Sequence, residues 1–134
     1  MDPVLARRRA ETARVGRLAT VTPDCRPHVV PCCFAVCGDT VYTAIDAKKK
    51  STLALRRLEN IRAHPVASLL VDHYTDEWWA LWWVRIDGRA RVVDTTPEAD
   101  DARNSLRAKY AQYEQVTMPG PVIALDITAW VAWP

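Results

Sequence analysis

The fold is decided by the stretch GRLATVTPDCRPHVVPCCFAVCGDTVYTAID, which spans residues 16–46. It consists of apolar runs separated by two short clusters of turn residues, Pro23-Asp24 and Gly38-Asp39. This spacing predicts two consecutive hairpins. Their strands are expected at residues 17–22, 27–37 and 40–46.

Two residues in this stretch predict local features of the backbone. Cys25 occupies a turn position that often requires a positive φ, which glycine normally supplies. Pro31 cannot donate a hydrogen bond to a neighbouring strand, so its strand has an irregularity or a free edge there. Both faces of residues 27–37 are apolar, which indicates that both faces are covered.

The rest of the chain alternates between helical and extended patterns. Ser51 is a suitable N-cap for a helix that ends at His64-Pro65. Further helices are predicted at residues 3–14, anchored by Val4, Leu5 and Val15, and at residues 97–110. Further strands are predicted at residues 66–72, 81–93 and 122–131. Six strands with helices outside them predict a mainly β fold with flanking helices, a small β-barrel in a single domain over residues 1–134.

The strand predicted at residues 81–93 alternates between two kinds of side chain. Trp82 falls on an apolar face with Val84 and Ile86, which predicts that it packs in the core. Trp83 shares the other face with Arg85, which predicts an interface or the wall of a ligand site.

Composition excludes several classes of function. The net charge of +2 is too small to indicate a nucleic-acid partner. No apolar run approaches the roughly 20 residues of a membrane helix, and the N-terminal residues lack the apolar region of a signal peptide. We therefore expect a cytoplasmic protein without membrane contact. The four cysteines lack the spacing of a zinc site, so we expect reduced, apolar side chains and no metal.

Four segments in order resemble the split-barrel flavin-binding family related to pyridoxamine 5′-phosphate oxidase: GRLATV (16–21), DCRPHVVP (24–31), NIRAHPVASLLVD (60–72) and GRARVV (88–93). The resemblance covers nearly the whole chain, with Cys25 standing where the family usually has glycine. It implies a six-stranded split barrel that forms a homodimer with the cofactor site at the subunit interface. The short length, the lysines and the tryptophan cluster are most similar to the branch that uses coenzyme F420.

The resemblance therefore implies an F420-dependent oxidoreductase that transfers a hydride between the deazaflavin and a small unsaturated molecule. Two alternatives stay open. One is an FMN-dependent oxidase or reductase on the same fold, and the other is a carrier that binds F420 or a flavin without catalysis. No catalytic triad, paired acids or metal constellation stands out, so the cofactor would carry the chemistry.

Basic residues directly before and within the helix predicted to begin at Ser51 indicate a site for the cofactor's phosphate. Lys48 and Lys50 precede the expected N-cap, Ser51, where free backbone N–H groups favour an anion. Arg56 and Arg57 follow within the helix and offer charge to an acidic tail. The alternative is that these cations lie on a solvated loop and a solvated helix face.

Four other residues complete the candidate set. Thr43 lies on the strand that leads into the lysines, where the resemblance implies contact with the ring and ribityl chain. Trp78 is expected to cover the ring of the partner subunit's cofactor, or to pack in the dimer alone, and Trp83 is expected to form a wall. His28 is a weak catalytic candidate for proton donation, with a structural hydrogen-bonding role as the alternative.

Overall fold

The computed structural model describes residues 1–45 and 52–134, with side chains of the second range described from residue 56 onward. The described residues form three α-helices, two 3₁₀ helices and seven strands. Their order is α1 (Pro3–Thr12), β1 (Gly16–Val21), β2 (Pro27–Cys32), β3 (Ala35–Cys37), β4 (Thr40–Ala44), α2 (Thr52–Ala63), β5 (Val66–His73), η1 (Trp78–Ala80), β6 (Trp82–Val93), α3 (Pro97–Lys109), η2 (Ala111–Glu114) and β7 (Val122–Trp133).

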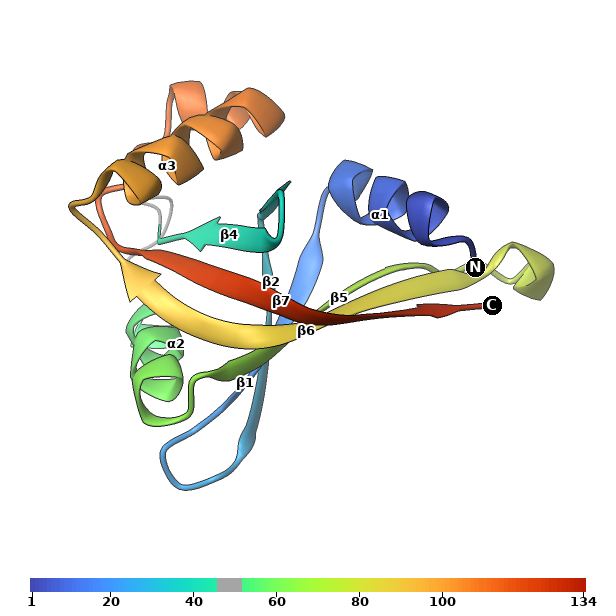
Figure 1. Cartoon of the computed structure of the whole chain (residues 1–134), viewed down its shortest axis with the longest axis horizontal. Helices are drawn as coiled ribbons and strands as arrows, with labels where there is room; N and C mark the ends of the chain where they lie inside the picture. Colours follow the sequence, from blue (N-terminus) through green and yellow to red (C-terminus); the bar gives the residue numbers. More distant parts are fainter. Residues whose placement is uncertain (46–51) are drawn as a thin grey trace.

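All seven strands belong to one antiparallel sheet in the order β2-β1-β5-β6-β7-β4-β3 (Figure 1). The two outermost strands, β2 and β3, follow one another in the chain. A link of two residues between opposite edges requires the sheet to curl, which makes it a split barrel. The predicted mainly β split-barrel fold is therefore confirmed.

The predicted number of six strands is wrong, because the strand expected at residues 27–37 divides in two. β2 pairs with β1, whereas β3 pairs with β4. Between these two strands, Phe34 is completely buried, and its backbone forms hydrogen bonds with the Tyr110 hydroxyl. That hydroxyl accepts from the Phe34 N–H at 3.1 Å and donates to the Phe34 carbonyl at 3.2 Å. A side chain thus takes the place of a neighbouring strand at this point.

The turn between β1 and β2 has the predicted backbone conformation. Cys25 has a φ of 65°, the only positive φ of a non-glycine residue in the part of the chain that the structure describes. The turn is closed by hydrogen bonds from the Thr22 N–H to the Arg26 carbonyl and from the Cys25 N–H to the Thr22 carbonyl, both 2.8 Å. Pro31 lies on an edge strand, as the sequence predicts.

Helix α1 is shorter than predicted and packs through different residues. It ends at Thr12, and the side chain of Asp2 caps its start by accepting from the Val4 N–H at 2.7 Å. The expected anchor Val4 is 68% exposed, whereas Ala6 and Ala10 are buried. The small side chains of Ala6 and Ala10 let the helix lie close to the sheet, whereas the larger Val4 faces solvent.

The core lies between the inner face of the curled sheet and the helices. The largest fully buried side chains include Phe34, Leu69, Ile86 and Ile123. A second cluster forms under α3, around Leu106 and Val122. The sheet departs from regular register between Asp87 and Gly88 of β6. A Cβ on Gly88 would lie 2.2 Å from the Asp126 carbonyl oxygen, so only glycine fits there.

Candidate functional site

Three of the predicted phosphate-site residues cannot be placed. Lys48, Lys50 and Ser51 lie outside the described residues. The described chain reaches Ile45, just past β4, and resumes at Thr52, where α2 begins. Their predicted role remains a prediction.

Thr43 and Arg57 both act on the thiol of Cys32. Thr43 on β4 is only 5% exposed, and hydrogen bonding from its side chain lowers the pKa of the Cys32 thiol on β2. The positive charge of Arg57 on α2 lowers the same pKa. Burial outweighs both effects and raises the pKa of the Cys32 thiol to about 11. We call these three residues the Cys32 cluster.

Arg57 is the member of this cluster that points to a ligand. Within the described part of the chain, its Nε is buried without a hydrogen-bond partner. A buried guanidinium N–H without an acceptor costs free energy, and an anionic oxygen is its strongest partner. Arg56, by contrast, is exposed. The two predicted arginines therefore occupy different environments, and Arg57 is the stronger candidate for binding an anion.

His28 lies on the same strand as Cys32, two alternations away, and so on the same face of β2. Its Nδ1 is buried and, among the described residues, has no hydrogen-bond partner. Its cross-strand neighbour Thr20 accepts from the Asn60 side-chain amide at 3.0 Å. The ring nitrogen of His28 is thus buried next to a strand that α2 contacts through Asn60.

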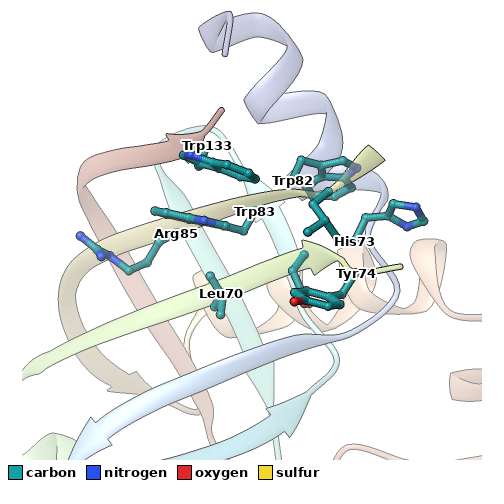
Figure 2. A pocket seen from close by; sticks show the side chains of 9 residues that line it. Leu70, His73, Tyr74, Trp82, Trp83, Arg85 and Trp133 are labelled. Carbon is teal, nitrogen blue, oxygen red and sulfur yellow. The ribbon is translucent and has the colours of Figure 1, made fainter. Parts of the chain in front are cut away.

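A pocket of about 550 Å³ opens on a different part of the sheet (Figure 2). It is formed by β5, the segment that follows it, β6 and β7, and no residue of α2 or β4 lines it. We call it the aromatic pocket; its lining residues are Leu70, Asp72, His73, Tyr74, Leu81, Trp82, Trp83, Arg85 and Trp133. Trp83 lies directly opposite Asp72 on β5 and Trp133 on β7.

The tryptophans divide as the alternation predicts, although their roles remain predictions. Trp83 and Arg85 share the face that forms the aromatic pocket. Trp82 packs partly against the core and also lines the pocket. Its ring lies 6.2 Å from His73, and the Arg9 guanidinium lies 4.8 Å above it. Trp78 is in η1, is 70% exposed and does not line the pocket.

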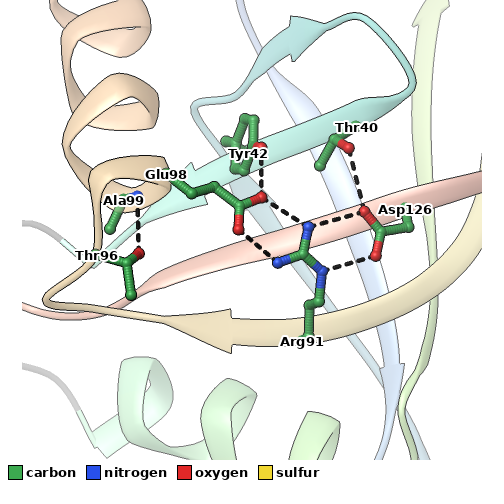
Figure 3. A network of polar contacts seen from close by, with 7 residues as sticks. All are labelled: Thr40, Tyr42, Arg91, Thr96, Glu98, Ala99 and Asp126. Carbon is green, nitrogen blue, oxygen red and sulfur yellow. Dashed lines mark hydrogen bonds and ion pairs between the residues drawn. The ribbon is translucent and has the colours of Figure 1, made fainter.

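A polar network on the outer face of the sheet was not predicted from the sequence (Figure 3). Arg91 of β6 bonds Glu98 of α3 through two nitrogens at 2.6 Å, and Asp126 of β7 at 2.7 and 3.0 Å. The Tyr42 hydroxyl donates to Glu98 at 2.7 Å, and the Thr40 hydroxyl donates to Asp126 at 3.1 Å. This Arg91 network joins α3 to three strands.

The network changes the acidity of its members. The Arg91 guanidinium holds the pKa values of Glu98 and Asp126 below their ordinary range. Burial, followed by the bond to Glu98, raises the pKa of Tyr42 to about 12. Each charged group in the network has a partner of opposite sign within the chain, so the network holds α3 against the sheet.

Sequence reasoning missed the residues that join the candidate groups. Cys32 looked like an ordinary apolar residue, although its position in an apolar strand facing Thr43 is a usable signal once the curl of the sheet is known. Trp133 lies far from Trp83 in the sequence, and only the pairing of β6 with β7 brings the two close.

The described residues contain neither a candidate metal site nor a candidate membrane-spanning helix. No group of three or more His, Cys, Asp or Glu side chains there could hold a metal ion. Over the same residues, no helix has the length and apolar character to cross a membrane.

Comparison with known proteins places the chain in a family. The family model described as pyridoxamine 5′-phosphate oxidase matches residues 5–133. No curated protein sequence matches the chain.

Solved structures share its fold. A conserved hypothetical protein from Mycobacterium tuberculosis superposes with a TM-score of 0.78 at 22% identity, covering 99% of this chain and 84% of that one. A heme binding protein from Mycobacterium smegmatis superposes with a TM-score of 0.74 at 20% identity, covering 94% of this chain and 52% of that one. A FAD-binding protein from Mesorhizobium loti superposes with a TM-score of 0.73 at 21% identity, covering 98% of this chain and 94% of that one. At these identities the likeness establishes the fold alone.

Proposed function

This chain belongs to the pyridoxamine 5′-phosphate oxidase family, and on that premise we propose that it is an F420-dependent oxidoreductase acting on a small unsaturated molecule. The single observation that carries the proposal is the buried Nε of Arg57, which has no acceptor among the described residues. A phosphate oxygen would supply that acceptor. The FAD-binding protein of the same fold supports a flavin-type ligand in general.

The residues of the Cys32 cluster fit such a ligand. Arg57 would bind an anionic oxygen through Nε, and Lys48, Lys50, Ser51 and the exposed Arg56 would add positive charge and donors around it. Thr43, which is only 5% exposed, would border the ligand from β4. When bound, the deazaflavin supplies the hydride. His28 is the candidate for holding or releasing a proton at Nδ1.

We further propose that the site is completed by a second copy of the chain. Trp83 lines the aromatic pocket, which contains no residue of α2 or β4, and Figure 1 places α2 near the C-terminal end of β6, away from the end where that strand begins. We infer that one ligand contacting both Arg57 and Trp83 would be held between two subunits. In such a homodimer, Trp78 and Trp83 of one subunit would cover the ring of the ligand held by the other.

The test of the cofactor is a paired titration of the purified protein with F420 and with FMN, followed by tryptophan fluorescence. We expect tight binding of F420 and weak binding of FMN. Arg57→Gln should weaken binding by at least about tenfold, because it removes a charge-assisted hydrogen bond. Arg56→Gln is the matched control and should have a smaller effect. Lys50→Glu should weaken binding without unfolding the protein.

Three results would change the proposal. Tight binding of FMN alone would favour the FMN enzyme. Binding of F420 without turnover of any acceptor would favour the carrier. Unchanged affinity in Arg57→Gln would remove the cluster from the site.

The test of the dimer is complementation. Arg57→Gln and Trp83→Leu chains are each expected to lose tight binding. Mixed and allowed to exchange, they should recover about a quarter of the sites, because half of the dimers are mixed and each has one intact site. No recovery, or a monomer by light scattering, would contradict the shared site.

A further inference from the structure

The aromatic pocket contains residues that the proposed cofactor site does not use. Trp133 of β7 lies directly opposite Trp83 and is 47% exposed, and Tyr74 at the end of β5 is 74% exposed. Figure 2 shows the rings of Trp83 and Trp133 on the same side of the sheet, with Leu70 and Tyr74 below them on β5 and just after it. The volume of about 550 Å³ falls within the range of pockets for drug-sized molecules.

The charged side chains of this pocket are already paired within the chain. Asp72 accepts from the Arg17 guanidinium at 2.8 Å. Arg85 donates to both oxygens of Asp87, at 2.8 and 3.0 Å, and Asp87 also accepts from the Ser68 hydroxyl at 2.6 Å. Each charge on the lining therefore has a partner of opposite sign, whereas the aromatic surfaces remain open.

We propose that the aromatic pocket binds a neutral, planar aromatic molecule. An anionic ligand would have to compete with Asp87 for Arg85, and a cationic ligand would have to compete with Arg17 for Asp72. A flat neutral ring can stack on Trp133 and Tyr74 without breaking either pair. That such a molecule is the substrate rests on the proposed function; that the pocket binds it does not.

The test measures binding by isothermal titration calorimetry without any cofactor. The probes are 2-naphthol, which is neutral at pH 7, and naphthalene-2-sulfonate, which has the same ring and a negative charge. We expect 2-naphthol to bind at least about tenfold more tightly than the sulfonate, with an affinity that does not change with salt. A sulfonate that binds equally well or better would overturn the proposal.

Variants locate the binding within the pocket. Trp133→Leu and Tyr74→Leu should each weaken 2-naphthol binding, the former by about tenfold through loss of a stacking surface. Trp79→Leu is the control, because Trp79 is fully exposed in η1 and does not line the pocket. Equal affinity in Trp133→Leu and the wild type would overturn the assignment.

The same variants separate this inference from the proposed function. Arg57→Gln should leave 2-naphthol binding unchanged while weakening F420 binding. Trp133→Leu should do the reverse. If 2-naphthol fails to bind while F420 binds, the pocket proposal is wrong and the cofactor proposal stands. If 2-naphthol binds while neither F420 nor FMN does, the pocket proposal stands alone.

Discussion

The two halves of strand β6 carry similar residues on their outer face and use them differently. In the first half, Arg85 pairs with Asp87 beside an open aromatic pocket. In the second half, Arg91 pairs with Glu98 and Asp126 in a network that fastens α3. The register shift between Asp87 and Gly88 separates the halves. The arginine–carboxylate pairs of Arg91 thus hold helix α3 against the sheet, whereas the Arg85–Asp87 pair lies at the edge of an uncovered pocket.

The largest expected effect is at the boundary between the halves. Gly88→Ala should destabilise the protein by about 3 kcal/mol or more, because the added Cβ would lie 2.2 Å from the Asp126 carbonyl oxygen and force β6 away from β7. Urea denaturation followed by circular dichroism measures it. The adjacent Arg89→Ala serves as the control. A near-neutral Gly88→Ala would mean that the register shift does not fix the two halves.

Arg91→Gln should lower the free energy of unfolding by about 2 kcal/mol, because it leaves Glu98 and Asp126 without their positively charged partner. This figure allows for solvent screening, since the Arg91 side chain is 42% exposed. The same denaturation assay applies. Arg89→Gln is the matched control on the same face of β6. It has no salt bridge among the described residues and should change stability by less than about 0.5 kcal/mol. Equal losses in the two variants would remove the distinction between them.

Acid should weaken the second half of β6 selectively. The pKa values of Glu98 and Asp126 are lowered in the folded protein, so their contribution is complete above their ordinary pKa values and is lost as the pH falls below about 4. The difference in stability between wild type and Arg91→Gln should therefore shrink from pH 7 to pH 3. Melting temperatures across that range measure it, and a constant difference would argue against the network.

The smallest effect is expected in the first half. Arg85→Gln should change stability far less than Arg91→Gln does, because the Arg85–Asp87 pair joins two residues of one strand at the surface. It should, however, remove the positive charge of Arg85 from the pocket's lining, while Asp87 keeps its hydrogen bond from Ser68. Binding of naphthalene-2-sulfonate should then stay weak. A loss of stability as large as that of Arg91→Gln would erase the contrast between the halves.

Local patterns predicted much of this fold. The turn at Cys25, the alternation of β6 and the edge position of Pro31 all depend on a few neighbouring residues, and the structure confirms them. The division of the second strand at Phe34 could not be predicted this way. It depends on Tyr110, which is 76 residues away and supplies hydrogen bonds that a strand would otherwise provide.

The candidate site was predictable in its residue types and less so in its geometry. The sequence identified Arg57 and Thr43 separately, but their shared effect on Cys32 follows from the curl of the sheet. It treated Arg56 and Arg57 alike, and only the packing of α2 gives them different environments. Trp133 was missed altogether, because its contact with the pocket depends on the pairing of β6 with β7.

The position of β7 has a consequence during protein synthesis. This strand is the last in the sequence, yet it lies inside the sheet between β6 and β4. Until residues 122–133 leave the ribosome, β6 and β4 each expose an unpaired edge, and the two parts of the sheet cannot join. The nascent chain is therefore expected to complete its fold only after release of β7, with its window of greatest aggregation risk just before.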